Sequence, residues 1–167
     1  MVIKVTNRNN FLVCCCFALF FGACDSNGIY NEYKSIPNST WKKTDTVRFN
    51  LSVLDTISKH NLYINIRNDK NYGFSNLFLI TKLNFPDGQK IVDTLEYEMA
   101  DVTGKFLGEG FTEIKENKLF YKEHKGFPKK GAYSLEINQA MRRNGVIDGV
   151  SDLEGILDVG FKIEKIK

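Results

Sequence analysis

From Trp41 onward, apolar and polar residues alternate in a series of short segments. Leu62, Ile64 and Ile66 fall on one side of the first clear segment. Alternation with a period of two is typical of a strand with one buried face. The same pattern predicts that two further triplets point inward, Tyr133/Leu135/Ile137 and Val159/Phe161/Ile163.

Other segments rich in β-forming residues lie at 46–51, 76–85, 90–97 and 113–121. The Asp-Gly pair at 87–88 separates two of them, which predicts a β-hairpin. Residues 139–144 are interpreted as a single helical turn. With about eight short strands and no long amphipathic helix, the sequence predicts an all-β, antiparallel β-sandwich of the jelly-roll type.

The first 24 residues have a different pattern. Lys4 and Arg8 precede an unbroken apolar run at 11–21, and the small residues Gly22 and Ala23 lead into Cys24. This run is shorter than the roughly 20 residues that span a bilayer, and its order matches a cleaved signal peptide. We predict a lipoprotein signal, cut before Cys24, with acyl groups such as palmitate on that cysteine. Ordinary secretion and an uncleaved anchor are the alternatives.

Three regions follow from this interpretation. Residues 1–23 form the signal peptide, residues 24–40 the lipidated cysteine with a tether or loosely docked arm, and residues 41–167 the β-sandwich. The arm has no sustained period of 2 or 3.6, although Tyr30, Tyr33 and Ile36 offer groups that would hold part of it on the domain. What remains after cleavage is one ordinary domain, long enough to bury a core.

Processing also changes the charge and the cysteine content. The formal net charge of +3 includes Lys4 and Arg8, so the mature chain is close to neutral and a nucleic-acid partner is not expected. Cys14, Cys15 and Cys16 lie in the apolar run, which leaves only Cys24. The exported domain therefore depends on its core, without a disulfide.

The sequence offers little catalytic chemistry. His60 and His124 are interpreted as solvated loop residues, since neither has neighbours at metal-ligand spacing. We expect no catalytic residue, no metal, no cofactor and no enzyme activity. A pair of carboxylates from distant strands stays open as an alternative, because sequence does not exclude it.

One polar cluster stands out as a candidate site. Arg67, Asn68, Tyr72 and Asn76 lie close together in the sequence, and Arg and Tyr are favoured as interface anchors. We interpret them as a candidate patch for a protein partner, while a purely structural role in a turn is the alternative. Trp41, the one tryptophan, is either a core residue or a platform for a sugar.

An ordered set of motifs gives the chain a family resemblance. After the lipobox and Trp41 come residues 67–68, 72–77, 85–88, 100–110, 131–133, 139–142 and 159–161. In this order the motifs resemble the gliding-motility lipoprotein family GldH of the Bacteroidota. The resemblance implies a β-sandwich lipoprotein of the cell envelope, related to machinery for gliding and type IX secretion. It implies no catalytic residue.

Two function classes remain from the sequence. The first is a non-catalytic scaffold lipoprotein, held in the bilayer by acylated Cys24 and contacting protein partners of the envelope. The second is an exported glycan-binding or glycan-active β-sandwich. No small-molecule substrate is identified. The expected location is the outer membrane, with the domain facing the periplasm.

Overall fold

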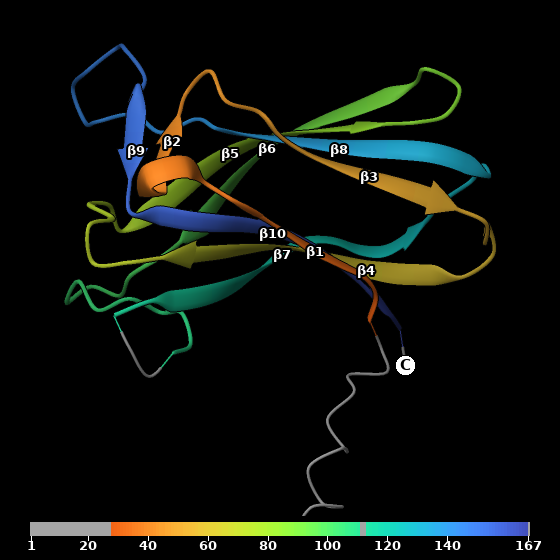
Figure 1. Ribbon diagram of the computed structural model, residues 1–167, viewed down its shortest axis with the longest axis horizontal. Helices are drawn as coiled ribbons and strands as arrows, with labels where there is room; N and C mark the ends of the chain where they lie inside the picture. Colours follow the sequence, from red (N-terminus) through yellow and green to blue (C-terminus); the bar gives the residue numbers. More distant parts are fainter. Residues whose placement is uncertain (1–27, 111–112, 167) are drawn as a thin grey trace, which may run out of the picture.

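The computed structural model describes residues 28–110 and 113–166, which fold into two antiparallel sheets packed face to face (Figure 1). The first sheet has the strand order β1-β10-β4-β7, and the second has the order β3-β8-β5-β6. The strands are β1 (Gly28–Ser35), β2 (Thr40–Lys42), β3 (Val47–Val53), β4 (Lys59–Asn68), β5 (Asn76–Asn84), β6 (Lys90–Glu98), β7 (Lys115–Gly126), β8 (Gly131–Gln139), β9 (Asp152–Glu154) and β10 (Ile156–Lys165).

The pairing of these strands is nested. β1 pairs with β10, β2 with β9, β3 with β8 and β4 with β7, and the nest closes at the β5–β6 hairpin. Rolling such a long hairpin into two sheets adds the β10–β4 and β5–β8 contacts. This is the arrangement of a jelly roll, so the predicted fold class is confirmed.

The described residues form ten strands rather than about eight. The eight long strands make the two sheets, and the additional two are the three-residue strands β2 and β9, which pair as a separate ribbon. Trp41 lies in β2 and is fully buried, and its indole Nε1 donates to the carbonyl oxygen of Asp45 at 3.0 Å. The indole therefore belongs to the core and offers no platform to a sugar.

The core lies between the two sheets and contains all three predicted inward triplets. Every side chain of these triplets is at most 3 % exposed. The rings of Phe49 in β3 and Phe161 in β10 meet across the sheets with centroids 5.9 Å apart. The register inferred from alternation is thus confirmed, because a shift by one residue would have turned each triplet outward.

The Asp-Gly hairpin is also confirmed. Phe85 N donates to the carbonyl oxygen of Gln89 at 2.8 Å, and Gly88 in the turn has a φ of +83°. This left-handed backbone conformation favours glycine, which explains the residue at that position.

Two local predictions are wrong. Residues 139–144 form no helical turn, because the side chain of Gln139 donates to the carbonyl oxygen of Val150 and accepts from Met141 N, which holds this segment as a loop. His60 is 3 % exposed rather than solvated, because β4 already begins at Lys59 and turns the imidazole inward against Phe127. His124 is exposed, as expected.

The range predicted as tether or arm joins the sandwich from Gly28 onward. β1 is an edge strand of the first sheet, and Tyr30 packs on Phe161 with ring centroids 5.7 Å apart. The predicted signal peptide and the predicted lipidation site Cys24 lie outside the described residues. Within residues 28–110 and 113–166, no helix has the length and apolar character needed to cross a bilayer.

Candidate functional site

The outer face of the first sheet carries a connected set of polar side chains, which we call the Tyr33 cluster. It consists of Tyr33, Asn65, Arg67, Glu116 and Asp158. The register of the sheet brings them together, because Tyr33 is opposite Gly160, Gly160 is opposite Asn65, and Arg67 is opposite both Asp158 and Glu116. Four neighbouring strands therefore contribute to one surface.

Gly160 allows Tyr33 to lie across β10. A Cβ atom at Gly160 would be 2.7 Å from Cε1 of Tyr33 and 3.1 Å from Cβ of Asn65. Without a side chain at this position, the phenol crosses the strand and its hydroxyl meets Asn65 and Glu116 on the far side. The glycine is thus a requirement of the cluster and not of a turn.

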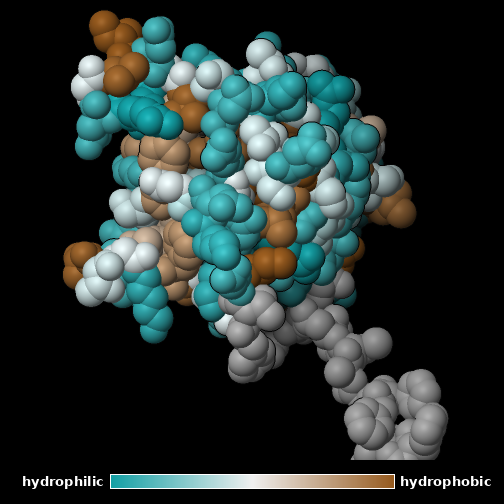
Figure 2. Space-filling model, turned by 60° about the vertical axis from the view of Figure 1, so that its left-hand side comes forward, coloured by the Kyte–Doolittle hydropathy of each residue, from teal (hydrophilic) through white to brown (hydrophobic). Residues whose placement is uncertain are grey.

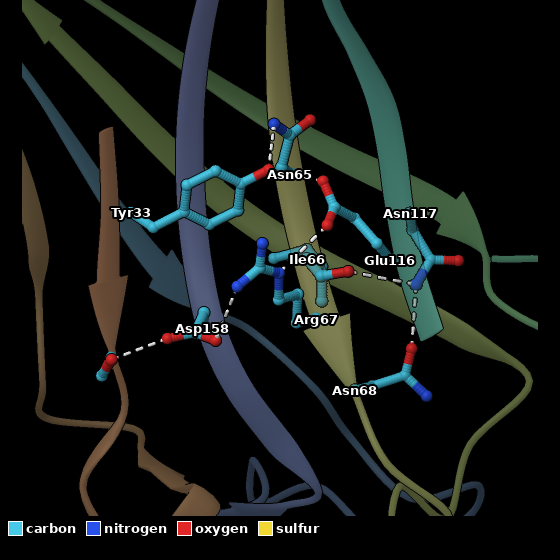
Figure 3. Close-up of polar contacts among 9 residues, drawn as sticks. Tyr33, Asn65, Ile66, Arg67, Asn68, Glu116, Asn117 and Asp158 are labelled. Atoms are coloured by element: carbon cyan, nitrogen blue, oxygen red, sulfur yellow. Dashed lines mark hydrogen bonds and ion pairs between the residues drawn. The ribbon is translucent and has the colours of Figure 1, made fainter. Parts of the chain in front are cut away.

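Arg67 is held on three sides in the middle of the cluster (Figure 3). Its Nε donates to Oε2 of Glu116 at 3.0 Å, its Nη1 lies 3.6 Å from Oδ2 of Asp158, and its guanidinium carbon is 4.5 Å from the centroid of the Tyr33 ring. The Tyr33 hydroxyl donates to Oε1 of Glu116 at 2.5 Å and accepts from Asn65 Nδ2 at 2.8 Å. These contacts fix the orientation of the guanidinium plane.

The ionisation of the cluster follows from these contacts. Burial raises the pKa of the Tyr33 hydroxyl to about 12, and its hydrogen bond to Glu116 acts in the same direction. Burial alone would raise the pKa of Glu116, but hydrogen bonds from Tyr33 and Arg67 outweigh it and lower that pKa below its usual value. At neutral pH the cluster therefore holds a neutral phenol, a carboxylate and a guanidinium.

The cluster stays open to solvent. The side chains of Arg67 and Glu116 are 40 % and 41 % exposed. Together with Asp158, these two side chains line a shallow hollow of about 340 Å³. Farther along the same face, the rings of Tyr63 and Phe120 meet edge to face at 5.3 Å. The face thus combines a fixed arginine with exposed aromatic surface.

The structure places Asn68, the residue after Arg67, on the inner side of the sheet. Asn68 is fully buried, and its Oδ1 accepts from Asn117 Nδ2 at 2.8 Å. Asn117 also donates to the carbonyl oxygen of Ile66 at 3.2 Å. The side chain of Asn68 is therefore directed away from the surface on which Arg67 lies.

Tyr72 and Asn76 lie together, but apart from Arg67. Tyr72 is 3 % exposed, and its hydroxyl donates to the backbone oxygen of Asn76 at 2.6 Å. The backbone at Tyr72 packs directly on Gly155, where a Cβ atom would be 2.1 Å from Tyr72 N. The Asn76 side chain donates instead to Glu96. Of the four residues in the predicted patch, the structure thus joins only Arg67 to the Tyr33 cluster.

The sequence did not point to Tyr33, Glu116 or Asp158 as partners of Arg67. Glycine opposite an aromatic residue in a strand pair is a usable signal, but the pairing of β1 with β10 has to be known first.

In the described part of the chain, no three histidine, cysteine or acidic side chains gather as metal ligands. The surface seen in Figure 2 is largely polar, with apolar groups at projecting corners.

The fold is a jelly-roll sandwich, and the outer face of its first sheet carries the Tyr33 cluster. Comparison with known proteins gives the family. Residues 28–163 match the model of the GldH lipoprotein family. The chain belongs to the GldH lipoprotein family, as its motifs suggested.

Two relatives match along nearly their whole length. The chain is 50% identical over 147 residues to the gliding motility lipoprotein GldH homolog of Christiangramia forsetii, covering 88% of this chain and 90% of that protein. It is also 50% identical over 148 residues to gliding motility lipoprotein GldH of Flavobacterium johnsoniae, covering 89% and 91%.

Solved structures show only distant likeness. A family GH115 4-O-methyl-alpha-glucuronidase matches 86% of this chain with 18% of its own, at 12% identity and a TM-score of 0.42.

Proposed function

We propose that this protein is a non-catalytic lipoprotein of the gliding motility apparatus that holds a protein partner in the cell envelope. The 50% identity to two gliding motility lipoproteins, over about nine tenths of each chain, carries the proposal. Lipid on Cys24 anchors the domain, in the outer membrane with the sandwich facing the periplasm.

The Tyr33 cluster is the partner surface in this proposal. Arginine and tyrosine are enriched among the residues that dominate interface energies. Arg67 is already fixed by Glu116, Asp158 and the Tyr33 ring, so a partner that binds it loses little side-chain entropy on association. The exposed Phe120 extends the same face with apolar surface.

Site-specific photocrosslinking in the native envelope tests the partner surface. A crosslinking residue at Phe120 probes the outer face of the first sheet, and one at Ile80 probes the outer face of the second. The two side chains are matched, with exposures of 44% and 41%. We expect a specific protein to be trapped from position 120 and not from position 80. Equal yields at both positions would contradict the choice of face.

Two arginine variants separate the cluster from general surface charge. Arg67→Ala should weaken the crosslink, because it removes the centre of the cluster. Arg48→Ala is the control, since Arg48 also pairs with a glutamate, Glu136 at 2.9 Å, but belongs to the second sheet. If both variants weaken the crosslink equally, the Tyr33 cluster has no particular role.

The motility role has its own test. The chain should restore spreading to a Flavobacterium johnsoniae strain that lacks its own GldH, since the two proteins are 50% identical. Failure of a properly exported and stable chain to do so would count against a shared role. The non-catalytic part of the proposal would be overturned if the purified protein cleaved a polysaccharide and a single Asp or Glu substitution abolished the cleavage.

A further inference from the structure

We propose that the folded domain itself rests on the bilayer through one end of the sandwich, where side chains of the β3–β4 loop enter the lipid headgroup region. This inference rests on the proposed lipidation of Cys24. It adds a defined orientation to the anchor, because one end of the sandwich contacts the lipid and the other projects away from it. We call the contacting end the tether end, and it consists of Ile29, residues 54–58 and the neighbouring residues 85–90 and 123–130.

Exposed apolar side chains mark the tether end. Leu54 is 77% exposed and Ile57 is 91% exposed, although both are large aliphatic residues. Ile29, in the neighbouring strand β1, is 49% exposed. Ile29 and Leu54 line the mouth of a cavity of about 360 Å³ whose walls include Leu51, Phe127 and Ile163. The surface thus offers apolar groups that water solvates poorly.

The loop between β3 and β4 holds Ile57 outward. Oδ1 of Asp55 accepts hydrogen bonds from the backbone nitrogens of Ile57 at 2.8 Å and Ser58 at 3.1 Å. An aspartate that binds the backbone two residues further on fixes a tight turn. The exposure of Ile57 is therefore a property of a defined turn.

Chain length restricts how far this end can lie from the lipid. Only four residues separate Cys24 from Ile29, so even a fully extended chain spans about 18 Å between them. β8, which runs away from the tether end, is nine residues long and extends about 30 Å. An anchor at Cys24 therefore keeps Ile29 and the β3–β4 loop close to the membrane.

The charges at the tether end favour an anionic bilayer surface. Val53 pairs with Gly131 and Asn84 with Ser134, which places the β5–β6 and β7–β8 connections at this end. Four lysines of the tether end, Lys90, Lys125, Lys129 and Lys130, exceed its three acidic residues, Asp55, Asp87 and Glu123, by one. Lysines close to a membrane surface are attracted to acidic headgroups.

Exposed apolar residues occur at the opposite end too, but the tether does not reach them. Ile147 is as exposed as Ile57, at 91%, and lies in the loop that follows β8. Figure 1 shows this loop on the left, while the β3–β4 connection lies on the right. The two isoleucines thus form a matched pair, one at each end of the sandwich.

The matched pair provides the experiment. The lipidated protein is purified and reconstituted into vesicles of phosphatidylethanolamine and phosphatidylglycerol, with Ile57→Cys or Ile147→Cys carrying an environment-sensitive fluorophore. The introduced cysteine is the only free thiol, since Cys24 carries lipid and Cys14 to Cys16 leave with the signal peptide. Nitroxide-labelled lipids then report which fluorophore lies in the headgroup region.

We expect the fluorophore at position 57 to be quenched at least about twofold more than that at position 147, because only interfacial groups approach the lipid quencher. Replacing phosphatidylglycerol with phosphatidylcholine should reduce the difference. Equal quenching at both positions would overturn the inference. Flotation of the vesicles separates the two proposals: protein that fails to float refutes lipidation and docking together, whereas protein that floats with equal quenching refutes docking alone.

Discussion

The ring of Tyr33 packs directly on Gly160, and a Cβ atom on that glycine would be 2.7 Å from Tyr33 Cε1. The contact joins an edge strand to the strand beside it and lets the tyrosine hydroxyl reach Asn65 and Glu116. The Tyr33 cluster therefore requires a residue without a side chain at position 160.

Gly160→Ala should lower the free energy of unfolding by about 1–3 kcal/mol, the usual cost of inserting an extra carbon into a packed site. Chemical denaturation measures the change. Gly73→Ala is the control, because no atom lies within 4 Å of the Cβ position there. Equal stability of Gly160→Ala and the wild type would show that Tyr33 moves away without cost.

Ile64→Ala and Phe161→Ala should each destabilise the domain by about 2–5 kcal/mol, because both side chains are fully buried between the sheets. The melting temperature and the denaturation midpoint should both fall. Ile57→Ala serves as a matched aliphatic control at a 91% exposed position, and its effect should stay within about 0.5 kcal/mol. A similar loss in all three variants would contradict the assigned core.

Tyr72→Phe should lower the free energy of unfolding by about 0.5–1.5 kcal/mol, the net value of one hydrogen bond. The hydroxyl that is lost donates to the backbone oxygen of Asn76 at 2.6 Å in a buried site. Because Tyr72 does not reach the surface, the crosslinking yield from position 120 should not change. A reduced yield with unchanged stability would assign Tyr72 to the partner surface after all.

Glu116 makes the stability of the first sheet depend on pH. Because its pKa is lower in the folded chain than its usual value, the carboxylate stabilises the fold above its unfolded-state pKa, near 4.5. This stabilisation is lost as the pH falls through the lowered pKa. The stability difference between the wild type and Glu116→Gln should therefore be larger at neutral pH than in acid.

Denaturation midpoints at neutral pH and below pH 4 measure this difference for Glu116→Gln. Glu98→Gln is a suitable control on an exposed position of β6. A difference that grows on acidification would have the wrong sign for the contacts of Glu116 with Tyr33 and Arg67.

Under the proposed lipidation, Cys24→Ala should move the protein from the membrane fraction to the soluble fraction, because the variant lacks the acyl chains that would anchor it. Cell fractionation with immunodetection gives the result directly. Cys16→Ala is the matched control within the proposed signal peptide and should leave the protein in the membrane fraction. Retention of Cys24→Ala in the membrane fraction would show that lipid on this residue is not what holds the domain there.

Alternation along the chain was sufficient to predict which residues point inward. The local period of two shows that Leu62, Ile64 and Ile66 share one face of their strand. The pair Asp87-Gly88 is sufficient to predict the β5–β6 hairpin. These features depend only on neighbours in the sequence, which is why they could be predicted without knowledge of the strand order.

Contacts between distant residues were not accessible in this way. Tyr33 and Glu116 are 83 positions apart and meet only because β1, β10, β4 and β7 are adjacent. The prediction of a helical turn at residues 139–144 fails for a related reason. The hydrogen bond from the Gln139 side chain to the carbonyl oxygen of Val150 outweighs the local preference for a turn of helix. The candidate surface thus required the sheet order, whereas the core did not.

The nested pairing has a consequence for how the protein matures. β1 is the first strand of the sandwich, and its only strand neighbour in the described residues is β10. β1 is therefore synthesised early but cannot pair until β10 has been synthesised. Such high contact order makes folding slow, because the entropy of closing very long loops is lost before the contacts form. A chain that ends before residue 156 would leave β1 and β4 without the strand that lies between them. The first sheet can therefore close only when the segment up to β10 is present, and truncation before this strand should prevent the sandwich from forming.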